Sequence, residues 1–214
     1  MSRMRFLKHL LIVMLLFICW TQEASAKGFK GDFTLQKDQP INIESDQVYY
    51  DKARELVYAS GNVILWQNDQ TIYADVAYFF RNDNEIYAKG NVAIAKVDGD
   101  TYFGDEIRFN RESYKGVVLN FKARMPPHST FSSTLAQMHN QDLIQLREFT
   151  YSPCSLCEAN FFSEKPLWKI NADGAVIDKQ DESITYSNAR IDVLDFPVFY
   201  SPYFQTPTPG AKRR

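Results

Sequence analysis

Residues 45–63 read SDQVYYDKARELVYASGNV and residues 74–92 read ADVAYFFRNDNEIYAKGNV, so one pattern recurs 29 positions later. A third copy begins with GDEIRF at Gly104, and a further copy begins with ADGAVID at Ala172. Such internal repeats indicate an array, because one unit cannot bury its apolar face until neighbouring units stack against it. The repeat therefore predicts a stack of similar units that share one continuous core.

Each copy has the pattern of two β-strands joined by a tight turn. Apolar residues occupy every second position, which places them on one face of a strand. Asp83 and Asn84 separate the two halves of the second copy, and these residue types favour turns because their side chains bond to the local backbone. Since no helical period is sustained after residue 26, the chain is predicted to be all-β, as a sandwich, a barrel or a jelly roll. The positions predicted to face the core are Val48, Tyr50, Val57, Val63, Ala77, Phe79, Ile86, Val92, Ile107 and Phe109.

The copies also share one acidic position. A residue that recurs once per repeat is expected to serve the repeat, for instance by bonding a turn backbone, rather than to act in catalysis. The sequence contains no zinc-protease, nucleophile-elbow or phosphate-loop motif. We therefore predict no enzymatic reaction, no cofactor and no metal. The acidic residues are Asp46, Asp75, Asp105 and Asp173.

The first 26 residues have the layout of a secretory signal peptide. Basic residues between positions 3 and 8 precede an apolar run at 10–20, and Ala24-Ser25-Ala26 provides a cleavage site. The apolar run would cover about 16 Å as a helix, which is short of the ~30 Å hydrocarbon core of a bilayer. The sequence therefore predicts an exported chain with a cleaved leader rather than an anchored one.

The remaining chain is predicted to consist of a flexible lead-in at 27–40, a β domain at 41–204 and a Pro-rich, basic tail at 205–214. The formal net charge is −2 with both signs interspersed. This provides no basic face, so nucleic acid is not a predicted partner.

Cys154 and Cys157 are the cysteines left after Cys19 departs with the leader. A zinc site would need two further ligands, and the histidines form no spaced pair. A thioredoxin-like dithiol would need the start of a helix, which an all-β chain does not supply. In an oxidising compartment a structural disulfide is the favoured interpretation. It could join the two cysteines or join them to cysteines elsewhere.

The apolar interior leaves two possibilities open. Its columns could be packed shut, or an open seam could make them a groove that holds acyl chains in water. The repeat openings and the Gly-Asn-Val closings resemble the OstA-like β-jelly-roll domain of lipopolysaccharide (LPS) transport. FTYSPCSLC at 149–157, PLWKI at 166–170 and FPVFYSPYF at 196–204 resemble, in that order, the periplasmic domain of the LptD family of outer-membrane LPS-assembly proteins.

The resemblance implies an OstA-like β-jelly roll built of strand pairs that repeat about every 29 residues. It implies a non-enzymatic periplasmic module, associated with the outer membrane, whose interior carries the acyl chains of lipid A. The ten core positions named above would line that interior. It also implies edge-strand pairing with the periplasmic bridge protein of the same system, which agrees with the tendency of an unpaired strand edge to accept another chain.

Members of the family continue into a C-terminal β-barrel whose cysteines pair with those of the jelly roll. Because this chain ends at Arg214, we expect a module without a barrel, and a separately encoded β-barrel is a candidate partner. The alternatives are a structural edge-strand module of the cell envelope and a non-functional remnant of a split gene. A periplasmic redox or hydrolytic enzyme is a further alternative, which rests on the two cysteines alone.

Overall fold

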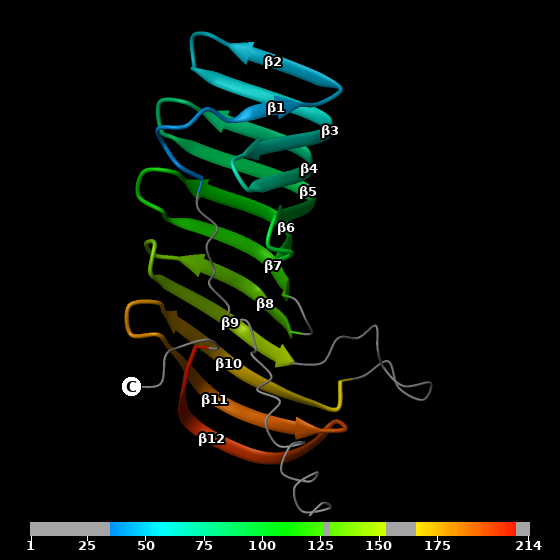
Figure 1. The fold of residues 1–214 in the computed structure, drawn as a ribbon, viewed down its shortest axis with the longest axis vertical. Coiled ribbons are helices and arrows are strands. Elements are labelled where there is room, and N and C mark those ends of the chain that lie inside the picture. The colour runs from blue at the N-terminus through cyan, green and yellow to red at the C-terminus, as the bar shows by residue number, and fades with distance from the viewer. Residues whose placement is uncertain (1–34, 126–128, 153–165, 209–214) are drawn as a thin grey trace, which may run out of the picture.

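A computed structural model describes residues 35–125, 129–152 and 166–208, and these residues form a single antiparallel sheet of twelve strands (Figure 1). No helix occurs within these ranges. The strands are β1 (Asn42–Glu44), β2 (Gln47–Asp51), β3 (Leu56–Gln67), β4 (Gln70–Phe80), β5 (Glu85–Lys96), β6 (Thr101–Asn110), β7 (Gly116–Met125), β8 (Ser129–Met138), β9 (Leu143–Ser152), β10 (Trp168–Asp178), β11 (Ser183–Val193) and β12 (Phe196–Pro207).

The chain builds the sheet as a meander. From β3 to β12 each strand pairs with the next strand in sequence. At the start of the sheet, β1 and β2 both pair with β3, β1 near its end and β2 near its beginning. The predicted stack of strand pairs is therefore confirmed, and the fold is an all-β jelly roll. Its two edges are β1 with β2 at one end and β12 at the other (Figure 1).

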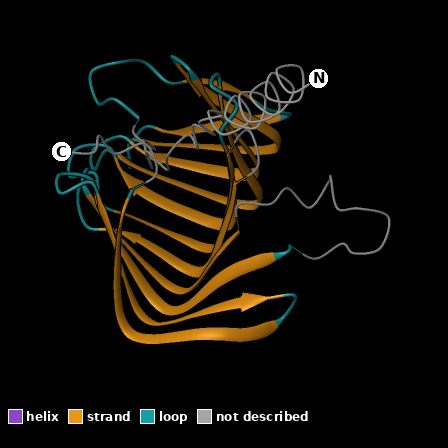
Figure 2. Ribbon diagram, turned by 60° about the horizontal axis from the view of Figure 1, so that its bottom comes forward, coloured by secondary structure: helices purple, strands orange, loops and turns teal. Residues whose placement is uncertain are grey.

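Most of the long strands bend near their middle, and β-bulges explain the bend. The pairing register shifts between Ser60 and Val63 and again between Lys89 and Val92. Gly61 and Gly90 in these shifts have φ values of 76° and 78°, a region that glycine enters without steric cost. An extra residue in one strand bends that strand. Figure 2 shows the result, in which the bent strands form two arms around a common interior.

We call the half of the sheet that is in register with β2 the first arm, and the half in register with β1 the second arm.

The repeated acidic residues lie at the bend between the arms, where each carboxylate accepts a hydrogen bond from the side-chain amide of an asparagine whose backbone φ is positive. The prediction that they serve the repeat is confirmed, although their common partner is a side chain rather than a turn backbone. The pairs are Asp46 with Asn62 (3.0 Å), Asp75 with Asn91 (3.0 Å), Asp105 with Asn120 (2.5 Å) and Asp173 with Asn188 (2.8 Å).

Candidate functional site

The inner face of the first arm carries two apolar columns that run perpendicular to the strands. Residues directly opposite each other in an antiparallel sheet point to the same face, so the pairing register traces each column. The first column contains Val48, Ala59, Ala77, Ala88, Ile107, Val118, Ala136, Leu146, Ala175, Tyr186 and Phe204. The second contains Tyr50, Val57, Phe79, Ile86, Phe109, Gly116, Met138, Ile144, Ile177, Ile184 and Thr206.

The inner face of the second arm carries a matching apolar column. It begins at β1 and reaches β12, so it spans the whole sheet. Most of its residues and most of those of the first arm belong to one hydrophobic cluster. The column contains Ile43, Leu65, Ile72, Ile94, Tyr102, Ala123, Phe131, Tyr151, Ile170, Ile191 and Phe199.

The ten positions predicted for the interior differ in burial. Val63, Ala77, Ile86, Val92, Ile107 and Phe109 are buried, and Val57 and Phe79 are half-buried.

Val48 and Tyr50, in contrast, are 57% and 43% exposed. The expectation that these two lie in a covered core is therefore wrong, although their register places them in the inner columns. They are exposed because β2 is an edge strand. The Tyr50 hydroxyl donates to the Glu55 carboxylate at 2.7 Å, and this hydrogen bond is the main reason that the pKa of Tyr50 is raised.

The far end of the interior is aromatic, and sequence reasoning did not assign it to the site. Phe131 packs against Tyr151 with ring centroids 4.8 Å apart, and Tyr186 packs against Phe204 at 5.6 Å. Burial raises the pKa of Tyr186 above the ordinary value of 10.0. The alternating pattern of the late repeat copy could have placed Tyr186 in the interior, because Tyr186 pairs with Ala175 and so continues its column.

The segment just before β1, which we call the strap (residues 35–40), crosses the interior from one arm to the other. Leu35, at its start, is buried in the hydrophobic cluster. On the second arm, the Gln67 side chain accepts from the Gln36 N–H at 2.6 Å and donates to the carbonyls of Gln36 and Gln39 at 3.0 and 2.9 Å. The described part of the predicted lead-in is thus tied to β3.

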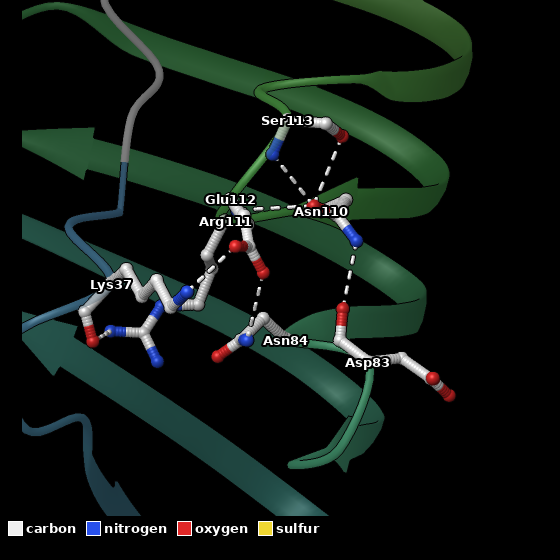
Figure 3. Close-up of polar contacts among 7 residues, drawn as sticks. All are labelled: Lys37, Asp83, Asn84, Asn110, Arg111, Glu112 and Ser113. Atoms are coloured by element: carbon white, nitrogen blue, oxygen red, sulfur yellow. Dashed lines mark hydrogen bonds and ion pairs between the residues drawn. The ribbon is translucent and has the colours of Figure 1, made fainter.

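On the first arm, Arg111 holds the same segment from the turn between β6 and β7 (Figure 3). Its Nη2 donates to the carbonyl of Gln36, to that of Lys37 at 3.0 Å and to that of Gln39 at 2.8 Å. Beside it, Lys37 forms an ion pair with Glu112 at 2.8 Å. No local sequence pattern indicates this arrangement, because the partners are more than 70 residues apart.

Other predicted features of the chain lie outside this site or outside the described ranges. Cys154 and Cys157 fall within 153–165, which the structure does not describe. Within the described ranges, no group of three or more His, Cys, Asp and Glu residues is placed to hold a metal ion.

None of the described residues forms a helix of the length and hydrophobicity that crossing a membrane requires.

Comparison with known proteins agrees with the fold. Residues 42–125 match the family described as LptA/(LptD N-terminal domain) LPS transport protein. The chain is 26% identical over 180 residues to the LPS-assembly protein LptD of Aliivibrio fischeri, covering 83% of this chain and 22% of that protein. It is 24% identical over 196 residues to LptD of Nitrosomonas eutropha, covering 91% of this chain and 25% of that protein.

The chain therefore spans about a quarter or less of the length of these relatives. Among solved structures, the periplasmic LPS-transport component LptH of Pseudomonas aeruginosa matches with a TM-score of 0.46 and 13% identity. That match covers 61% of this chain and 93% of LptH.

Proposed function

Because residues 42–125 match the family of LptA and LptD N-terminal-domain LPS transport proteins, we propose that this chain carries the acyl chains of lipid A in its interior. In this proposal the jelly roll is a non-enzymatic periplasmic module of LPS transport and outer-membrane assembly. The lining is the set of inner columns, which contain eight of the ten positions predicted from the sequence, together with the buried Val63 and Val92 next to the bulges. The observation that carries the proposal is the continuity of the apolar inner face from β2 to β12.

The ends of this inner face support transport rather than storage. At the first edge, Val48 and Tyr50 belong to the inner columns yet are exposed. At the opposite edge, Phe199 continues the second-arm column and is also exposed. An acyl chain could therefore pass from the interior to a neighbouring apolar surface without crossing a polar rim.

The same edges support the proposed pairing with the periplasmic bridge protein. β12 extends over twelve residues and pairs only with β11 among the described strands. An edge of this length presents a row of free backbone donors and acceptors to which another strand can bond. A separately encoded β-barrel, the leader, export to the periplasm and the disulfide remain predictions.

Photo-crosslinking tests lipid carriage directly. A photoreactive phenylalanine analogue at Phe79, on the inner face of β4, should give an adduct with lipid A in cells. The matched control is Tyr78, the next residue on the same strand, whose ring packs on the outer face against Tyr58 at 5.0 Å. Lipid adducts from Tyr78 but not from Phe79, or from neither position, would refute the proposal.

A second candidate function is that of a structural module that docks by its edge strand while its core stays closed. The apolar side chains of β12 favour it, since Phe196 is 74% exposed. This function predicts that a partner protein co-purifies through β12 without bound lipid. Lipid extracted from the purified complex would decide for the first proposal.

A further inference from the structure

Arg111 is a buried cation, and the carboxylate that acts on its charge is the exposed Asp38 of the strap. Its side chain is enclosed, since the residue is 4% exposed, and its guanidinium lies 5.5 Å from the ring centre of Phe79. Within the described ranges no carboxylate hydrogen-bonds to Arg111, although the charge of Asp38 partly offsets the effect of burial on its pKa, and the Arg111 Nε has no hydrogen-bond partner. Burial lowers the pKa of Arg111, yet an arginine side chain keeps its proton in proteins. A full positive charge therefore lies beside the inner column.

Burying such a charge raises the free energy of the folded state unless an anion pairs with it. The three strap carbonyls that Arg111 contacts carry only partial negative charges. A guanidinium presents its donors in a planar fork that matches two oxygens of a phosphate or carboxylate. The carbonyl oxygens of Lys37 and Gln39, at 3.0 and 2.8 Å from Nη2, stand where the oxygens of such an anion would bind.

We propose that Arg111 is the receptor for the phosphate group of an amphiphile whose hydrocarbon chains lie along the inner columns, and that the strap competes with this phosphate. The inference rests on the proposed function and adds a headgroup site to it. Phe79 joins the two parts of the site, because its ring contacts the guanidinium and belongs to the apolar column. Gln67 holds the strap from the opposite arm by donating to the carbonyls of Gln36 and Gln39, which also accept from Arg111, so its amide borders the proposed phosphate position.

The test compares three probes on the purified protein: phosphorylated lipid A, the same lipid without its phosphates, and inorganic phosphate. The wild type should bind the phosphorylated lipid roughly tenfold or more tightly than the dephosphorylated lipid, since a hydrogen-bonded charge pair would be lost. Arg111→Gln should remove this preference, measured as the ratio of the affinities of this one variant for the two lipids. Arg147→Gln, which removes an exposed arginine from β9, should keep the preference.

Two further variants keep the test decisive if Arg111→Gln does not fold. Arg111→Lys retains the charge but not the fork, so the preference should shrink without disappearing. Leu35→Ser removes the buried apolar anchor of the strap, so it should bind the phosphorylated lipid more tightly than the wild type does.

Each contrary outcome has a distinct meaning. Equal binding of both lipids by the wild type would overturn the receptor role of Arg111 and leave lipid carriage intact. Binding of neither lipid would overturn the proposed function and this inference together. If inorganic phosphate binds in an Arg111-dependent way while the lipids show no preference, the site takes free phosphate and the headgroup role is wrong.

Discussion

Replacing Gly90 with alanine should destabilise the fold by disrupting one bend of the sheet. Gly90 has a φ of 78°, where a side chain adds about 1–2 kcal/mol of strain. Its new Cβ would also lie 2.9 Å from the Cβ of Asp75, so the carboxylate must move and lose its hydrogen bond from Asn91. That bond contributes about 1 kcal/mol. The expected loss in the free energy of unfolding is therefore roughly 2–3 kcal/mol.

Urea denaturation measures this loss, and Gly174→Ala is the matched control. Gly174 lies next to Asp173 of the late copy, has no positive φ, and its added Cβ would meet its nearest atom at 3.5 Å. The control should change the free energy of unfolding by less than about 1 kcal/mol. Gly90→Ala should lower the urea concentration at the midpoint of unfolding, and it should lower the Tm by roughly 4–12 °C. Equal midpoints for the two variants would show that the bulge does not impose the bend.

Phe109→Ala should lower the free energy of unfolding by about 3–5 kcal/mol, because the ring is 1% exposed in the inner column. Tyr49→Ala at the exposed edge should lower it by less than about 1 kcal/mol. Thermal unfolding compares the two variants, and similar losses would contradict the assignment of the inner face. Because burial raises the pKa of Tyr186, the folded state keeps the phenolic proton where the unfolded chain has lost it. The corresponding stability is present below about pH 10 and is lost as the pH rises above that value. Tyr186→Phe should therefore flatten the alkaline fall in the urea midpoint, and an unchanged slope would exclude this cause. Asn120→Ala should cost about 1–3 kcal/mol, since it removes a 2.5 Å bond at a residue with a φ of 51°. Asn42→Ala is the control, because Asn42 is exposed and its replacement should leave the urea midpoint unchanged.

Much of the site could be predicted because the face of a strand residue depends on local alternation. Val48, Ala77 and Ile107 were placed on one face from the period of two, and the register confirms a single column. Their burial could not be predicted in the same way. Val48 has the same local pattern as Ala77, but a strand lies on only one side of it.

The sequence by itself determined the repeated strand pairs, the acidic residue at each bend and the apolar character of the inner face, because each follows from residues near one another in the chain. Tertiary structure alone decided which inner residues are exposed and what closes the space between the arms. Gln67 and Arg111 both donate hydrogen bonds to the carbonyl of Gln36, which lies 31 and 75 residues earlier in the sequence, respectively. These contacts form only after the bent sheet has brought its two arms opposite each other, so no local pattern records them. The repeat thus determines the apolar columns, and the fold places a buried cation beside them.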